Sequence, residues 1–350
     1  MKLRDVAAYV TEKVQVSSLT NKTYIGVDNL LQNKAGVSDS EYLPQSGYAI
    51  AFKRNDILLG NIRPYFKKIW LAEFDGGCSP DVLCIRCKDV GHAKFLYAVL
   101  SQEAFFDYDM KGTKGSKMPR GDKSHIMNYD IPILRNFQSV GNLNKLIECK
   151  IHANKLINDN LEKQAQLIFD YMFRDLSGLK HVGDYIKPKR GTVLLSKDAV
   201  LGDIPVIAGG LEPAIYHNIA NTLEPVVTIS SSGANAGFVN LWGVPVWSSD
   251  SSYIDSAMTP YVYFWYAFLK RHQNNIYSIQ TGSAQPHIYP SHIMALPIGD
   301  LDYEKVSQYT ESVTPLFSMV AKNYKESKEL SSLRDYLLPL LMNGQAYIED

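Results

Sequence analysis

Two long stretches of the chain carry apolar residues at helical spacing. One heptad frame places apolar residues from Val140 to Tyr171, and a second frame does so from Val306 to Leu341. Such a stripe needs a partner helix to cover it, and each stretch offers the other a matching one. The sequence therefore predicts two long helices that pair antiparallel. The predicted contact residues are Leu143, Ile147, Ile157, Leu161, Ile168, Val313, Leu316, Val320, Leu330 and Leu337.

The remaining sequence has a different texture, with short β-branched or aromatic runs bounded by Gly, Pro, Asn and Ser. Examples are DVLCIR at 81–86, EPVVTIS at 224–230 and VPVWSS at 244–249. Runs of this kind predict short strands in a mixed, β-rich structure. The predicted order is globular, helix, globular, helix, with boundaries at 1–137, 138–176, 177–300 and 301–350.

One phrase occurs twice. GSKMPRGDKSHIM at 115–127 matches GSAQPHIYPSHIM at 282–294 with a constant offset of 167 residues. Upstream, YAVL at 97–100 matches YAFL at 266–269, and Ser79 and Asp81 match Ser248 and Asp250. An ordered series of matches at so long a period indicates two duplicated domains rather than a solenoid. The predicted fold class is α+β, with two tandem globular domains, two long antiparallel helices and a pseudo-two-fold internal repeat.

Composition limits the choice of function. The chain has no net charge, and 45% of its residues are hydrophobic and 21% charged, as in ordinary globular proteins. We expect a cytoplasmic protein without membrane contact, since the start MKLRDVAAYV lacks an apolar core and no apolar run reaches about 20 residues. The single CxxC, at Cys84 and Cys87, has no second ligand pair for zinc. Walker, dinucleotide and methyltransferase motifs are absent, so we expect no metal or cofactor on this chain.

Four further phrases carry a resemblance. DILLGNIRPYFKK at 56–68, TISSSGANAG at 228–237, TGSAQPHI at 281–288 and LRDYLLPLLMNGQ at 333–345 stand in the order and spacing found in specificity subunits of Type I restriction-modification systems. With its tandem layout, the chain resembles that family over nearly its whole length.

The resemblance implies a non-catalytic DNA-binding subunit. Each globular part would be a target recognition domain that reads one half of a bipartite, asymmetric target in double-stranded DNA. The helices would fix the spacer between the halves and dock two methyltransferase subunits, and restriction or motor subunits could join. S-adenosylmethionine, ATP and Mg²⁺ are expected on those partner subunits.

Candidate DNA contacts fall in four short segments. A glycine-rich basic loop can meet phosphates or guanine, a turn after a predicted strand can face a groove, small hydroxyls beside glycines can hold a phosphate, and amides can read base edges. The bland alternatives are a solvated loop, ordinary strand-end polarity and a tight hairpin. In the order given, the candidates are Lys114, Lys117, Arg120 and Lys123; Arg63, Tyr65, Lys67 and Lys68; Ser231, Ser232 and Asn235; and Gln280, Thr281, Ser283, Gln285 and His287.

Two other functions stay open at this point. Two globular parts on a helical pair could form a protein-binding adaptor without DNA readout. Pro80-Asp81 followed by Asp109-Met110-Lys111 fits the loose pattern of Mg²⁺-dependent nucleases. The repeated His125 and His292 suggest catalysis less than a shared framework, because both copies keep them at the same place.

Overall fold

The computed structural model describes residues 1–115, 117–282 and 285–348. The chain divides into two compact units, the first made of Met1–Ile151 with Lys328–Asp350 and the second of His152–Ser327. The long helices α5 (Phe137–Met172) and α9 (Tyr303–Met342) contribute one part to each unit. Each compact unit therefore combines a globular part with one stretch of each long helix.

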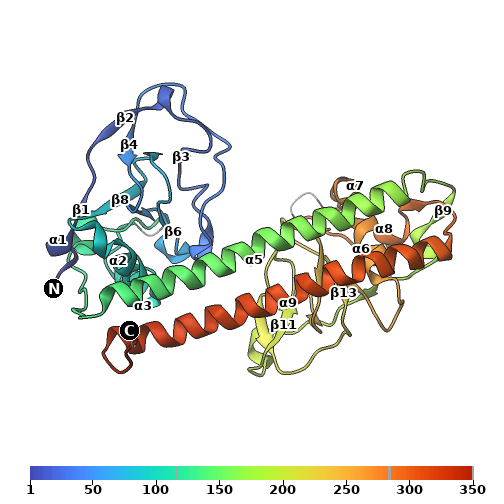
Figure 1. Ribbon diagram of the computed structural model, residues 1–350. Helices are drawn as coiled ribbons and strands as arrows, with labels where there is room; N and C mark the ends of the chain where they lie inside the picture. The colour runs from blue at the N-terminus through green and yellow to red at the C-terminus, as the bar shows by residue number, and fades with distance from the viewer. Residues whose placement is uncertain (116, 283–284, 349–350) are drawn as a thin grey trace. The chain divides into compact units, whose positions relative to one another are not determined.

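The first unit is built on an antiparallel sheet of order β1-β8-β5-β6 (Figure 1). Its strands are β1 (Ala7–Tyr9), β5 (Ile57–Gly60), β6 (Ile69–Leu71) and β8 (Val82–Cys87). Strand β5 is buried on both faces: Ile57 and Leu59 pack in a core with the helices, and Leu58 packs in a second core on the other face. This explains why its sequence reads as a continuous apolar run rather than an alternating one.

A smaller sheet and short helices complete the first unit. The sheet has the order β2-β4-β7-β3 and consists of β2 (Lys13–Gln15), β3 (Tyr24–Ile25), β4 (Tyr48–Phe52) and β7 (Gly76–Cys78). The α-helices are α1 (Leu3–Val6), α2 (Ala93–Leu100), α3 (Glu103–Lys111) and α4 (Lys123–Ile126). The 3-10 helices are η1 (Val16–Ser18), η2 (Gln32–Lys34), η3 (Pro64–Phe66) and η4 (Val90–His92).

The second unit repeats this plan with the sheet order β10-β16-β13-β14. These strands are β10 (Lys189–Arg190), β13 (Val226–Ser230), β14 (Val239–Trp242) and β16 (Ser251–Asp255). Two smaller sheets contain β11 (Ile204–Ile207), β12 (Ile215–His217) and β15 (Trp247–Ser248), and β9 (Lys180–His181) with β17 (Pro297–Ile298). The other helices are α6 (Val262–Arg271), α7 (Gln273–Ser278), α8 (Pro290–Met294), η5 (Val182–Asp184) and η6 (Ser196–Asp198).

The strand registers show the internal repeat at the level of single residues. Gly60 pairs with Val82 in the first unit, and Ser230 pairs with Ser251 in the second. One sequence match shifts by a residue. The Ser79 N–H donates to the Ile25 carbonyl, and it is the Ser249 N–H, not that of Ser248, that donates to the corresponding Ile207 carbonyl. The predicted match of Ser79 with Ser248 is therefore wrong, because the first unit has one extra residue before Asp81.

In the second unit, α5 and α9 pair antiparallel, since early residues of one contact late residues of the other. The Tyr309 hydroxyl donates to the Ala165 carbonyl (3.3 Å), and the Asn323 amide donates to Asn158 Oδ1 (2.8 Å). The Asn154 amide donates to Glu326 Oε2 at 2.8 Å. Polar groups thus lie inside a helix contact that is otherwise lined by Phe169, Val313 and Phe317.

In the first unit, the end of α9 packs on the start of α5. Leu338 and Leu341 are buried in the same core cluster as Val140. That cluster also holds most of α2, so the helix pair and the main sheet share one core. Among the described residues, no helix is long and apolar enough to cross a membrane.

The predicted helix contacts need one correction. Ile147 and Val313 are buried, and the other predicted contact residues except Ile157 are half-buried; these are Leu143, Leu161, Ile168, Leu316, Val320, Leu330 and Leu337. Ile157 is 45% exposed, and the buried residues on this part of α5 are instead Asn154, Ala165 and Phe169, with Asn158 half-buried. A straight helix drifts from a strict heptad over several turns, which explains the error.

Candidate nucleic-acid interface

In the first unit, the turn between β5 and β6 lies against the loop between α3 and α4. The Arg63 N–H donates to the Pro119 carbonyl at 2.8 Å, and Ile62 forms a β-bridge with Arg120. The loop closes on itself, because Lys114 and Arg120 exchange backbone hydrogen bonds of 3.0 and 3.1 Å. Two segments about 55 residues apart in sequence, both predicted to contact DNA, thus form one surface, which we call the first loop cluster (residues 61–67, 114–115 and 117–120).

In the second unit, the turn between β13 and β14 lies against the loop between α7 and α8 in the same way. The Gly233 N–H donates to the Pro286 carbonyl (3.0 Å), and Ser232 forms a β-bridge with His287. Thr281 and His287 exchange backbone hydrogen bonds of 3.0 and 2.8 Å. We call this surface the second loop cluster (residues 231–237, 281–282 and 285–287). It joins the predicted candidates Ser231, Ser232, Asn235, Thr281, Gln285 and His287. Gln280 directly precedes it, and Ser283 lies outside the described residues.

The two loop clusters share one frame of main-chain hydrogen bonds. The Asn61 N–H donates to the Asp81 carbonyl (3.0 Å), as the Ser231 N–H does to the Asp250 carbonyl (3.0 Å). The Gly121 N–H donates to the Asn61 carbonyl (3.2 Å), as the Ile288 N–H does to the Ser231 carbonyl (2.9 Å). All of these bonds join main-chain groups, so the shared frame does not depend on the side chains at these positions.

The side chains on this shared frame differ in charge. The first cluster exposes Arg63, Tyr65, Lys117 and Arg120. In the second cluster, Thr281 and Gln285 are exposed and His287 is half-buried, and neither Thr281 nor Gln285 can carry a charge. The Gln280 amide donates to the Ala236 carbonyl (2.7 Å), which ties the loop to the turn. Asn235 is half-buried, and its carbonyl accepts from the Phe238 N–H at 2.9 Å.

The turn of the first cluster has unusual backbone angles. Arg63 and Lys67 both adopt the left-handed conformation with φ of 52°, on either side of η3. The corresponding positions in the second unit are Gly233 and Gly237, with φ of 83° and 85°. A side chain in this conformation costs about 1–2 kcal/mol, and glycine avoids the cost. The first unit thus keeps a large cation at a position where the second unit keeps a glycine.

Two of the predicted DNA contacts in this turn point elsewhere. Lys68 is 9% exposed and donates through Nζ to the Val27 carbonyl (2.6 Å), and burial lowers the pKa of its ammonium. The prediction of a DNA contact at Lys68 is therefore wrong. The Lys67 ammonium is half-buried and bound to Glu103, so its charge is already matched within the unit.

Two further lysines of the basic loop have partners. Lys114 forms an ion pair with Asp122, and this ammonium holds the pKa of the Asp122 carboxyl well below its usual range. Asp122 also accepts from the N–H groups of Ser124 (2.9 Å) and His125 (3.0 Å), which caps α4. Lys123 is exposed, and its ammonium lies 5.9 Å from the centre of the Tyr9 ring.

Ser231 also departs from its predicted role. The residue has none of its surface exposed, and its Oγ forms no hydrogen bond within the described parts of the chain. A buried hydroxyl cannot hold a phosphate, so the side-chain prediction for Ser231 is wrong. Its neighbour Ser232 is half-buried and donates through Oγ to Asp250.

Sequence reasoning missed an aspartate–arginine contact beside each cluster. Arg120 approaches Asp81, with Nη2 at 3.3 Å from Oδ1, and Arg190 approaches Asp250, with Nη2 at 3.1 Å from Oδ1. The guanidinium of Arg190 also lies 5.8 Å from the centre of the Tyr289 ring. The recurrence of Asp81 and Asp250 in the two halves was a usable signal for the aspartates. Arg190 offered none, because it stands on a short strand remote in sequence from both loops.

The nuclease pattern does not form a surface site. Asp109 is 1% exposed, and burial raises the pKa of its carboxyl to about 6. Lys111, two residues later, is exposed. Within residues 1–115, 117–282 and 285–348, no group of three or more His, Cys, Asp or Glu side chains is placed to hold a metal ion. An Asp at this depth cannot reach a phosphate, so the pattern match carries no nuclease geometry.

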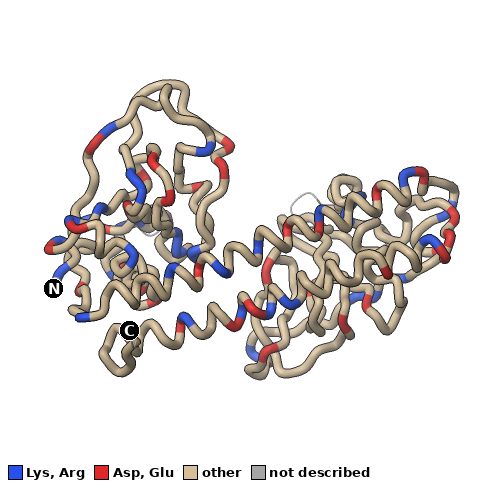
Figure 2. Tube along the Cα trace, viewed as in Figure 1, with Lys and Arg blue, Asp and Glu red and all other residues tan. Residues whose placement is uncertain are grey.

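Charge is spread rather than concentrated in either unit. Figure 2 shows basic and acidic positions interspersed along both of them. The basic character of the first loop cluster is therefore local. This fits the zero net charge of the whole chain.

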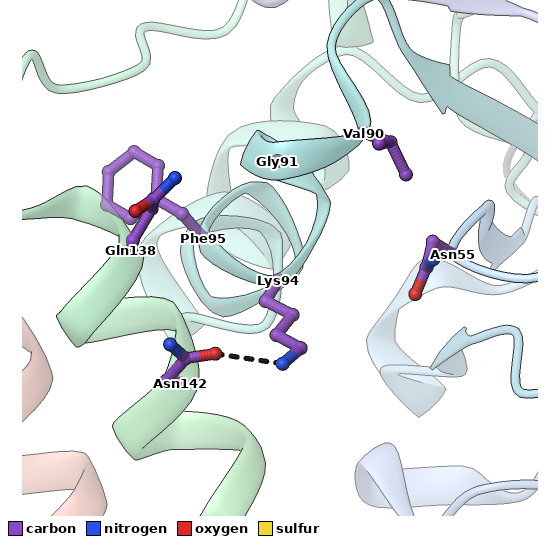
Figure 3. Close-up of a pocket in the computed structure, with 7 residues that line it drawn as sticks. All are labelled: Asn55, Val90, Gly91, Lys94, Phe95, Gln138 and Asn142. Carbon is purple, nitrogen blue, oxygen red and sulfur yellow. Dashed lines mark hydrogen bonds between the residues drawn. The ribbon is translucent and has the colours of Figure 1, made fainter.

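A separate hollow of about 310 Å³ lies in the first unit, beside the start of α5 (Figure 3). Its only charged lining residue, Lys94, donates to Asn142 Oδ1 at 2.8 Å (Figure 3). The hollow shares no residue with the loop clusters and brings no candidate chemistry together. It is lined by Asn55, Val90, Gly91, Lys94, Phe95, Gln138 and Asn142.

No protein-family model and no curated protein sequence matches the chain. Solved structures do. The S subunit of a Type I restriction-modification system from M. genitalium is similar over 97% of this chain and 94% of its own, with 15% identity and a TM-score of 0.60.

Two further structures align at lower TM-scores. The HsdS subunit from Thermoanaerobacter tengcongensis covers 99% of this chain and 96% of its own, with 17% identity and a TM-score of 0.38. A chain from a study of complex assembly and conformational transition of the type I R-M system covers 98% and 96%, with 15% identity and a TM-score of 0.41. Of these three structures, the M. genitalium S subunit supports a comparison of architecture. By that comparison, and by the tandem units and long helices described above, the chain has the fold of a Type I restriction-modification S subunit.

Proposed function

We propose that the chain is a DNA-specificity subunit that reads a bipartite, asymmetric target and catalyses no reaction itself. One observation carries the proposal. The two units share a main-chain frame but present different exposed side chains on it. Two domains that read different half-sites need the same scaffold but different surface side chains, because side chains recognise the identity of a base. The likeness in fold to the M. genitalium S subunit supports the same conclusion.

The two clusters would contact DNA in different ways. In the first, Arg63 and Lys117 are exposed cations suited to phosphates, and Arg120, held beside Asp81, keeps donors suited to guanine. In the second, Thr281, Gln285 and His287 offer hydrogen-bond groups with little charge, and a Gln amide pairs well with adenine. The first loop cluster would therefore supply most of the electrostatic attraction between the chain and DNA.

The partners follow from the proposed role. Two methyltransferase subunits would dock on the chain and modify adenine in the two half-sites. Restriction and motor subunits would join in systems that cleave DNA. S-adenosylmethionine, ATP and Mg²⁺ would bind to those subunits, all in the cytoplasm. A chain with no net charge would also rely on partners for many phosphate contacts, which dominate affinity for DNA.

A selection from random double-stranded DNA tests the proposal. The full chain is co-purified with its candidate methyltransferase subunit, and bound DNA is sequenced. We expect a two-part motif with different halves and a fixed gap. The variant Lys117→Ala should select the same motif with lower affinity. If an intact complex enriches no motif, the DNA-reading role fails and the chain is a protein-binding adaptor.

A further inference from the structure

Each loop cluster is bordered by an equivalent pair of one aspartate and one arginine. These Asp–Arg pairs are Asp81–Arg120 in the first unit and Asp250–Arg190 in the second. The aspartates occupy the same place in the frame, since the Asp81 carbonyl accepts from Asn61 and the Asp250 carbonyl accepts from Ser231.

The arginines reach this place by different routes. Arg120 belongs to the loop before α4, whereas Arg190 belongs to β10, which pairs with β16. The position matching Arg120 in the second loop is His287, by the shared pattern of backbone bonds. Duplication therefore accounts for the two aspartates but not for the two arginines. A guanidinium beside this carboxylate has arisen separately in each unit, which indicates a role that both units need.

Both pairs are accessible. The side chains of Arg120 and Asp81 are 52% and 40% exposed, and those of Arg190 and Asp250 are 43% and 32% exposed. Each contact to the aspartate uses Nη2 of the arginine. Within the described residues, Nε and Nη1 of the two arginines form no hydrogen bond to the chain. Each fork therefore keeps donors for a ligand while one end is held.

Held in this way, the arginines are poor candidates for simple phosphate attraction. A carboxylate 3.1–3.3 Å away cancels most of the local positive charge and repels phosphate. In the second unit, Tyr289 and Ser232 restrain the pair further, through a ring contact and a hydrogen bond to Asp250. What remains is a fixed arrangement of donors next to acceptors.

That arrangement matches the major-groove edge of one base pair. Guanine presents N7 and O6 as acceptors for an arginine fork, and the paired cytosine presents an N4 amino group that a carboxylate accepts. We propose that each Asp–Arg pair reads one G·C base pair, so that Arg190 and Arg120 are specificity-determining residues for the two half-sites. This inference rests on the proposed function, and it adds the identity of one base pair in each half.

The experiment has a protein arm and a DNA arm. In the protein arm, the full chain with its methyltransferase subunit is taken through DNA selection as wild type, Arg190→Ala and Arg120→Ala. We expect one G·C position in each half of the wild-type motif. Arg190→Ala should reduce the preference at that position in one half only, about tenfold to hundredfold, and Arg120→Ala in the other half. Lys117→Ala is the control and should weaken all sequences alike.

The DNA arm uses wild-type protein, so a variant that fails to fold does not decide the result. The selected target is synthesised with 7-deazaguanine, which lacks the N7 acceptor, at the assigned guanine or at another guanine. Binding should fall about tenfold only for the assigned guanine.

A wild-type motif whose G·C positions resist both the arginine variants and 7-deazaguanine overturns the inference and leaves the proposed function standing. If the wild-type complex selects no two-part motif, the proposed function fails, and the inference fails with it.

Discussion

The first and second units carry the same backbone frame but fill the space beneath it differently. In the first unit, Asp109 lies beside Gly121, where a Cβ would come within 2.6 Å of Asp109 Oδ1 and 2.9 Å of Asn61 Oδ1. In the second unit, the matching positions are Ile276 and Ile288, and both lie close to the turn residue Gly237. A polar cluster and an apolar one thus support the same loop geometry. The main-chain bonds define that geometry, and the filling and the surface are free to vary.

The largest effect should come from placing the first unit's carboxyl in the second. Ile276→Asp removes buried apolar surface and introduces a carboxyl among isoleucines, so we expect a loss of about 4 kcal/mol in the free energy of unfolding. Urea denaturation at pH 7 measures it. The matched control Ile276→Val should lose about 1 kcal/mol. A loss below about 1 kcal/mol for Ile276→Asp would show that the two fillings are interchangeable.

The buried carboxyl of the first unit should make stability depend on pH. The folded pKa of Asp109 is about 6, above its ordinary value of 3.8, so the folded state binds the proton more tightly than the unfolded state. Stability from this group is therefore greatest below pH 4 and falls as pH rises towards about 6, by about 3 kcal/mol in all.

The variant Asp109→Asn should remove that dependence. It should be about 3 kcal/mol more stable than wild type at pH 8 and equal to it at pH 4. Urea denaturation at several pH values tests this. Asp107→Asn, an exposed change on the same helix, is the control and should follow wild type. Parallel curves for Asp109→Asn and wild type would mean that Asp109 titrates alike in both states.

Exchanging Arg63 and Gly233 between the two turns should change the free energy of unfolding in opposite directions. Arg63→Gly relieves a left-handed side chain and should raise the free energy of unfolding by about 1 kcal/mol, while it weakens DNA binding by the complex. Gly233→Arg imposes the same conformation and should lower stability by about 1–2 kcal/mol. Thermal unfolding and DNA titration measure the two effects. A gain in both stability and DNA affinity for Arg63→Gly would mean that the arginine serves neither.

The smallest effect separates the two clusters by charge. Lys117→Ala should reduce the slope of log affinity against log salt by about 1, because one phosphate contact is lost. Gln285→Ala should leave the slope unchanged, since it removes no charge. Titrations of the selected target at four salt concentrations give both slopes. Equal slopes for Lys117→Ala and wild type would place Lys117 away from DNA.

The features that depend on repetition and periodicity could be predicted from sequence. The repeat, the two long helices and the segments that form the loop clusters could be predicted from the repeated phrase, the heptad spacing and the Gly-rich polar segments. The predicted helix contact at Ile157 is wrong because small departures from a heptad accumulate along a straight helix. The predicted DNA contacts at Lys68 and Ser231 are wrong because both side chains point into the protein. Lys68 binds a main-chain carbonyl and Ser231 Oγ is buried, and no local sequence pattern indicates either orientation.

The Asp–Arg pairs show a different limit. Asp250 and Arg190 are 60 residues apart, and their meeting depends on the pairing of β10 with β16. Strand pairing over such a distance is a property of the whole fold. Sequence alone could name Asp250 through its repeat partner Asp81, but the arginine needed the structure.

A surface whose support lies in peptide groups is open to rapid change. The bonds that join turn and loop, such as Gly233 N–H to Pro286 O, make no demand on the outward side chains. Substitutions there should alter which DNA is bound while the protein goes on folding, so new specificities can accumulate by drift and be screened as libraries. For the same reason, residues 281–287 could be grafted in place of residues 114–120, because the two loops are closed by equivalent backbone bridges.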